Sequence, residues 1–256
     1  MGTEGATGLR PTPQRHGYFV EEVRPGEAEA SGVLDEIGRI RSDFRRGMHD
    51  GTTIGHRRRS ALHYAFIRAY YHSTEGWLEF ARKADSGAFL HTLIVSFFAI
   101  YKRDVHSNIM QTGSTPVPHH WRPYFDLARK AAKRPEAYVR ALGLFFGARA
   151  HVRFDLGMAL VDTYLAFDAR GEAVPELDTL RGELLGVSSS QLFSGAARRY
   201  FAPFDEHVTN RLPPSQRIAA ALVDIRVAEA IWLAHFQGWR RQAWSSALTQ
   251  IAAQPP

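Results

Sequence analysis

One stretch of the chain places a histidine and two aspartates at helical spacing. Positions about 4, 7 and 11 residues apart stack on one face of an α-helix, so His151, Asp155, Met158 and Asp162 are expected to line up. The residues between them are mostly apolar, which suits a buried helix. Buried carboxylates and imidazoles are costly unless they are paired, so this polar row needs partners, a metal or a water-filled pocket.

The row has three interpretations. In the first, Asp155 orients and charges His151, which acts as a general base. In the second, both side chains bind a divalent cation together with Asp162 or a group from another helix. In the third, a histidine–aspartate hydrogen bond joins two helices and has no chemical role.

The last predicted helix carries further polar residues. Asp224 and His235 are spaced to share one face, and Arg226 and Glu229 lie a turn apart on another. Antiparallel packing could bring one of these rows against His151. Arg226 could hold a substrate carboxylate or phosphate in a bidentate grip, or it could form a simple ion pair with Glu229.

Two more histidines lie among aromatic residues. His63 shares a helix face with Tyr70 and Trp77, and His91 lies on a strongly apolar helix from which it could reach a central pocket. Each could also be a neutral core histidine. A third possibility is a non-catalytic helical protein. Its ligand cavity would be lined, or its core merely filled, by the aromatic residues Phe66, Tyr70, Trp77, Phe97 and Phe98.

Helical periodicity extends over most of the chain and predicts an all-α fold. Apolar residues recur every three or four positions over 33–46, 60–82, 88–105, 124–133, 135–167, 177–185, 188–200 and 215–251. Gly47 is expected to end the first helix, and the long helix after Pro135 is expected to bend at Gly143 or Gly147. We therefore predict a single bundle-like domain of about seven or eight helices over 31–256, after a flexible arm over 1–30.

A proline-rich loop is expected before the helix that carries His151. Residues 112–123 contain prolines that a regular helix interior does not accommodate. Trp121 is the expected anchor of this loop. Neighbouring side chains diverge in a loop, so His119 and His120 are not expected to chelate an ion together.

Composition excludes several classes of protein. The chain has no cysteine, which removes disulfides, thiolate metal sites and cysteine nucleophiles. The net charge of +6 is spread along the chain, with Arg57-Arg58-Arg59 as the compact basic run, so no nucleic-acid partner is expected. No apolar run approaches the roughly 20 residues of a membrane span, and the first residues do not form a secretory signal, so we expect a cytoplasmic location. Phosphate-loop, HExxH, GxSxG, ExxH and DDxxD signatures are absent from the sequence.

Residues 147–161, GARAHVRFDLGMALV, resemble the segment G-x-N-A-H-[IV]-x-x-D-L-x-x-A-L of an uncharacterised bacterial all-helical family. The likeness extends roughly from Ser60 to Trp244 and departs at Arg149, where the family has Asn. The resemblance implies His151, Asp155 and Arg226 as positions to test, and it implies no substrate. Through its HxxxD spacing, the helix more weakly resembles zinc phospholipases C and nucleases of the P1 type. Those enzymes use a larger set of His and Asp ligands and an N-terminal Trp, which this sequence does not show.

These observations favour an enzyme of bacterial small-molecule metabolism, including secondary metabolism, that performs acid–base chemistry such as cyclisation, isomerisation or hydrolysis in an interhelical pocket. The expected catalytic residues are His151, Asp155, Asp162 and Asp224. The expected substrate-binding residues are Arg226, His63, Tyr70, Trp77 and His91. The sequence itself requires no cofactor, so the cofactor is left open, with a divalent metal as the candidate. The alternatives are a divalent-metal hydrolase, with His151, Asp155 and His235 as ligands, and a non-catalytic helical protein that binds a ligand or a partner.

Overall fold

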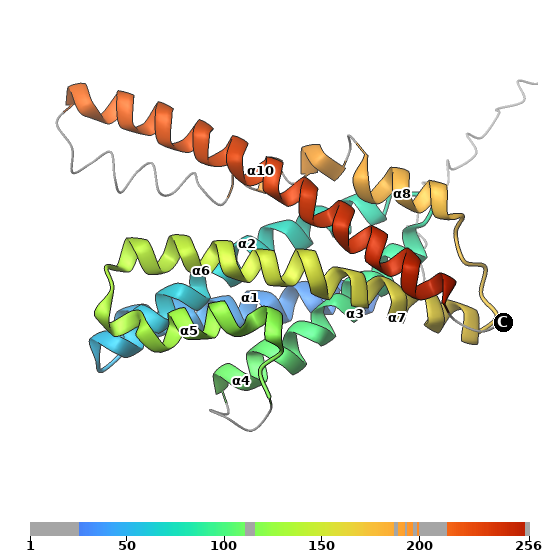
Figure 1. Cartoon of the computed structure of the whole chain (residues 1–256), viewed down its shortest axis with the longest axis horizontal. Coiled ribbons are helices and arrows are strands. Elements are labelled where there is room, and N and C mark those ends of the chain that lie inside the picture. Colours follow the sequence, from blue (N-terminus) through green and yellow to red (C-terminus); the bar gives the residue numbers. More distant parts are fainter. Residues whose placement is uncertain are drawn as a thin grey trace, which may run out of the picture.

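The computed structural model describes residues 26–110, 116–186, 189–192, 194–196, 199 and 214–253, and gives only the backbone for residues 137 and 214–232. Every regular element in these ranges is a helix, which confirms the all-α prediction (Figure 1). The elements are α1 Glu27–Asp50, α2 Ile54–Ala81, α3 Gly87–Tyr101, a π-helical segment Lys102–His106, α4 Ser107–Met110, a 3₁₀ turn His119–Trp121, α5 Arg122–Lys130, a 3₁₀ turn Ala131–Lys133, α6 Glu136–Ala150, a π-helical segment His151–Asp155, α7 Leu156–Ala169, α8 Leu177–Leu185 and α10 Pro214–Ala252.

Helices distant in sequence pack side by side. α1 packs along α2, α2 along α6, and both α3 and α10 pack on α7 (Figure 1). The buried side chains form three clusters, one centred on α1 and α2, one on α3 and α7, and a smaller one between the end of α6 and α10. Among the described residues, no helix has the combination of length and apolarity that crossing a bilayer requires.

The first two helices have different boundaries from those predicted. α1 begins at Glu27 and continues through Gly47 to Asp50, so the predicted stop at Gly47 is wrong. A Cβ atom at Gly47 would lie 2.5 Å from Ser60 Oγ, so this glycine allows α1 and α2 to approach closely. α2 begins before Ser60, because Thr53 Oγ1 accepts the backbone N–H of His56 at 3.1 Å and caps the helix. Residues 1–25 of the predicted arm, and parts of the helix predicted over 188–200, lie outside the described residues.

The long helix predicted after Pro135 forms, but it departs from α-helical geometry at a different place. The departure is the π-helical segment His151–Asp155 between α6 and α7, rather than a bend at Gly143 or Gly147. A Cβ atom at Gly143 would lie 2.6 Å from Leu62 Cγ, and one at Gly147 would lie 2.5 Å from Phe66 Cδ2. The two glycines therefore permit close packing of α6 on α2.

Candidate active site

The centre of the candidate site is the carboxylate of Asp155, which is fully buried. Its Oδ2 atom accepts a hydrogen bond from His151 Nδ1 at 2.9 Å and one from Trp121 Nε1 at 3.1 Å. Its Oδ1 atom accepts a hydrogen bond from His120 Nε2 at 2.7 Å. Donors from the 3₁₀ turn before α5 and from the π-helical segment therefore converge on one carboxylate.

The surroundings keep Asp155 charged and His151 neutral. Burial alone would raise the pKa of Asp155, but the hydrogen bonds from His120 and His151 more than offset it and hold that pKa below its usual value. Burial also lowers the pKa of His151, and it outweighs the bond and charge of Asp155, which raise that pKa. An ionised carboxylate only accepts hydrogen bonds, so the neutral His151 ring carries its proton on Nδ1 and its lone pair on Nε2.

Aromatic rings hold the imidazole of His151 in place. Phe97 stacks on it with ring centroids 3.6 Å apart and planes 9° apart, and Tyr70 meets it edge-on at 4.6 Å. Phe66 and Trp121 lie 5.7 Å and 6.1 Å from the same ring. Within the described part of the chain, the Nε2 atom is buried and has no hydrogen-bond partner. A buried polar atom without a partner is unusual and marks a position where a ligand group would be stabilising.

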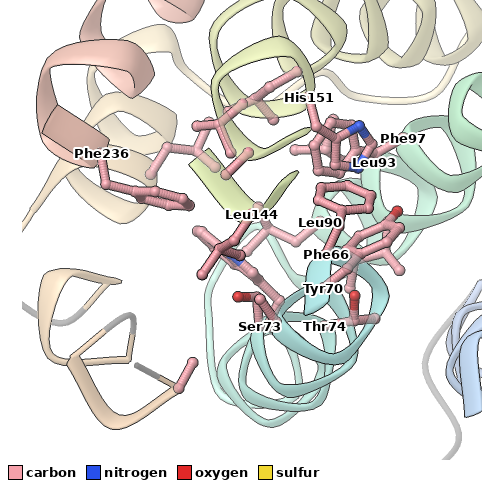
Figure 2. A pocket seen from close by; sticks show the side chains of 18 residues that line it. Phe66, Tyr70, Ser73, Thr74, Leu90, Leu93, Phe97, Leu144, His151 and Phe236 are labelled. Atoms are coloured by element: carbon pink, nitrogen blue, oxygen red, sulfur yellow. The ribbon is translucent and has the colours of Figure 1, made fainter. Parts of the chain in front are cut away.

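His151 lies at the edge of a cavity of about 90 Å³, which is more than enough for a water molecule (Figure 2). The cavity lies where the three buried clusters meet, and α2, α3, α6, α7, α8 and α10 all contribute to its wall. Its lining is aromatic and aliphatic, with polar groups from Tyr70, Ser73, Thr74 and His151. No Lys, Arg, Asp or Glu is among the described residues that line it. In Figure 2, His151 and Phe97 lie together on one side of the cavity and Phe236 lies across from them.

Other predicted substrate-binding residues differ in where they lie. Tyr70 and Trp77 line the cavity. His63 is buried but not part of the lining, and its Nδ1 atom lies 2.7 Å from the hydroxyl of Tyr124. Burial, with smaller effects of nearby charges, lowers the pKa of His63 from 6.5 to about 3, so this ring is neutral. His91 is also fully buried without contributing to the lining.

The predicted polar row does not extend beyond Asp155. Asp162 is exposed, because it lies about 10 Å further along the helix than Asp155, beyond the turn that covers that carboxylate. His235 is exposed on α10 and stacks on Trp239 with ring centroids 5.9 Å apart. The side chains of Asp224 and Arg226 lie outside the described residues.

A comparison with protein families bears on this arrangement. Residues 33–256 match the model of a family described as a family of unknown function (DUF5995). The chain belongs to DUF5995. This confirms the predicted resemblance to an uncharacterised helical family, and the match includes α6, the π-helical segment and α7. No curated protein and no solved structure matches this DUF5995 chain.

Sequence reasoning did not identify His120 as part of the site. It assigned this residue to a loop in which the two histidines diverge, and His119 is indeed exposed while His120 turns inward to Asp155. The neighbouring Trp121 could have indicated His120, because a residue next to a buried side chain lies close to the groups that this side chain contacts. Trp121 is fully buried, as predicted.

Metal binding by the predicted ligands does not fit the geometry of this DUF5995 chain. The described residues contain no group of three or more His, Asp or Glu side chains arranged to hold an ion. His151 Nδ1 and His120 Nε2 both point at oxygens of Asp155, which uses both carboxylate oxygens as acceptors. The structure does not bring the ring of His235 into this group, because that ring packs against Phe145 and Trp239.

Proposed function

We propose that this protein is an enzyme that performs acid–base chemistry on a small, uncharged and largely apolar molecule bound in the cavity beside His151. The observation that carries the proposal is the buried Nε2 atom of His151, which has no partner in the described part of the chain and belongs to a residue that lines the cavity. Its ring is fixed by Phe97 and Asp155.

The pair of His151 and Asp155 has the features of a general base. The lone pair on Nε2 can take a proton from a bound molecule, and the Asp155 carboxylate then stabilises the imidazolium that forms. The carboxylate also fixes the tautomer, because it accepts the Nδ1 proton. His151 could return the same proton to a different atom of the substrate, which is the chemistry of an isomerisation or a cyclisation.

The cavity lining supports a particular class of substrate. A charged molecule would lose its hydration there without meeting an opposite charge among the described lining residues, which is costly. Hydroxyl groups of Ser73 and Thr74 offer polar contacts on an otherwise apolar wall. A neutral, mainly hydrocarbon or aromatic molecule with one hydroxyl, N–H or acidic C–H group would complement this arrangement.

The test compares the wild-type protein with His151→Asn. An asparagine amide can replace Nδ1–H as the donor to Asp155 but has no atom at the position of Nε2, so the variant removes the base and keeps the bond. Each protein is incubated with a neutral small-molecule extract, and mass spectrometry records which compounds change. His119→Asn, at an exposed neighbour of His120, is the matched control.

We expect the wild type and His119→Asn to transform the same compound and His151→Asn to transform it at least about a hundredfold more slowly, as for the loss of a general base. Equal rates in the wild type and His151→Asn would refute the proposal. A second candidate is non-catalytic binding of an apolar ligand, which the mainly apolar lining favours. It predicts compounds that bind and stabilise the protein but stay unchanged in all three samples.

A further inference from the structure

His120 reaches the centre of the site from a different part of the chain. It lies in the 3₁₀ turn His119–Trp121, 35 residues before Asp155, and its Nε2 atom is 2.7 Å from Asp155 Oδ1. Its side chain is 16% exposed, whereas those of Asp155 and His151 are 0% and 3% exposed. The ring stacks on Phe154 with centroids 5.0 Å apart. His120 therefore joins the outer edge of the site to the buried pair.

The bond from His120 limits how the carboxylate can turn. The terminal torsion of an aspartate is broad, so a single hydrogen bond to His151 would leave the carboxylate plane free to rock. His120 holds Oδ1 while His151 and Trp121 hold Oδ2, and donors on both oxygens define the plane. The Oδ2 atom is thereby kept in line with His151 Nδ1.

The same bond supports the charge of Asp155. A fully buried carboxylate keeps its charge only if hydrogen bonds replace the water it has lost. Of the three donors, His120 makes the shortest bond, at 2.7 Å. Without it, the long contact of 3.4 Å with Trp121 Nε1 is what Oδ1 would retain from the described residues, because the stronger tryptophan bond is to Oδ2.

We infer that His120 is a positioning residue for His151, acting through Asp155: it fixes the carboxylate plane so that the His151 ring keeps its proton on Nδ1 and leaves Nε2 unprotonated. The catalytic purpose of this arrangement rests on the proposed function. The arrangement itself is a property of the free protein and can be measured without a substrate.

The experiment is nuclear magnetic resonance of the full chain with ¹⁵N-labelled histidine. Two variants separate the hydrogen bond from the ring packing. His120→Phe keeps a ring against Phe154 but removes the donor, and His120→Gln can place an amide N–H near the former Nε2 position. The readouts are the tautomer of His151 and the exchange rate of its Nδ1 proton with water.

In the wild type we expect His120 to carry a proton on Nε2 and His151 to be a single tautomer with its proton on Nδ1. In His120→Phe we expect a mixture of His151 tautomers, or exchange of the Nδ1 proton about tenfold faster or more, since a hydrogen bond to a charged group is worth at least that factor. His120→Gln should restore most of the wild-type behaviour.

Two results would overturn the inference. One is a wild-type His120 ring with a bare Nε2 atom, which cannot donate to an ionised carboxylate; this measurement needs no variant and so does not depend on variant folding. The other is a folded His120→Phe protein whose His151 tautomer and proton exchange equal those of the wild type, which would make His120 a packing residue only. Neither result bears on the reaction of His151, which the mass-spectrometric comparison of the wild type with His151→Asn tests. The inference about His120 and the proposed function can therefore be refuted independently of each other.

Discussion

Replacing Asp155 by asparagine tests the central electrostatic argument, because the substitution keeps the shape and removes the charge. Asp155 accepts hydrogen bonds from His120, His151 and Trp121. An asparagine amide has one oxygen and one NH₂ group, so it cannot accept at both positions. At least one imidazole N–H would face an N–H donor, and that imidazole would have to shift its proton to the other nitrogen or lose its partner.

The expected loss follows from the bonds that are broken. A hydrogen bond to a charged group contributes about 1.5–3 kcal/mol, and a buried donor left without a partner costs about 1–3 kcal/mol. Because asparagine does not carry the desolvation cost of a buried charge, part of this loss is offset. We expect Asp155→Asn to lower the free energy of unfolding by about 2–4 kcal/mol at pH 7, which corresponds to a fall in Tm of about 5–10 °C for a chain of this size.

The loss should also depend on pH in a definite direction. The pKa of Asp155 is lower in the folded protein than its usual 3.8, so its stabilising effect is present above pH 3.8 and is lost as the pH falls through the folded pKa. The free energy of unfolding, measured with urea, should therefore differ between the wild type and Asp155→Asn by the same amount at pH 7 and pH 5. The two values should converge at lower pH.

The matched control for this prediction is Asp162→Asn, an exposed carboxylate on the same helix, which should change stability by no more than about 0.5 kcal/mol. Two results would refute an ionised Asp155 that accepts these bonds. One is an Asp155→Asn protein as stable as the wild type at pH 7. The other is a difference in stability that is undiminished at the lowest pH where both proteins fold.

Further substitutions test the packing and the second buried histidine. Gly147→Ala would place a Cβ atom 2.5 Å from Phe66 Cδ2, so overpacking should outweigh the gain in helix propensity and destabilise the protein by about 1–2 kcal/mol in urea unfolding. Gly182→Ala, with open space around it, should instead stabilise by about 0.5–1 kcal/mol, and equal effects of the two would contradict the packing argument. Tyr124→Phe removes the partner of His63 and should cost about 1–3 kcal/mol, whereas an unchanged stability would mean that His63 has another partner. Because the pKa of His63 falls from 6.5 to about 3 on folding, the wild type should lose stability as the pH drops from 6.5 towards 3, and His63→Gln should lose less.

The sequence predicted the helices well where apolar periodicity and capping residues agreed. The helix at Leu177–Leu185 has the predicted bounds, and Trp121 is the buried anchor of the loop before α5. The start of α2 was missed because its first two turns are largely polar. The cap at Thr53, rather than an apolar residue, sets that boundary.

The candidate site was only partly predictable. The pairing of His151 with Asp155 follows from a spacing of four residues, and the structure shows it. His120 could not be found in this way, because its contact depends on how a loop returns to a helix 35 residues later. The exposure of Asp162 was missed for a related reason: periodicity says which face a residue occupies, but not how far along the helix neighbouring segments cover that face.

The π-helical segment His151–Asp155 joins α6 to α7 and carries both members of the buried pair. A π-type hydrogen bond encloses one residue more than an α-type bond, so the wide turn accommodates an additional residue locally and the helices on either side keep the faces that they present to their neighbours. Gly157, whose Cβ position lies only 3.1 Å from Ala243 O, marks the close approach of α7 to α10 that this orientation allows. Deleting one of residues 152–154 would therefore be expected to restore regular α-helix and leave α7 facing α10, while it shortens the spacing of His151 and Asp155 from four residues to three and so disturbs their hydrogen bond.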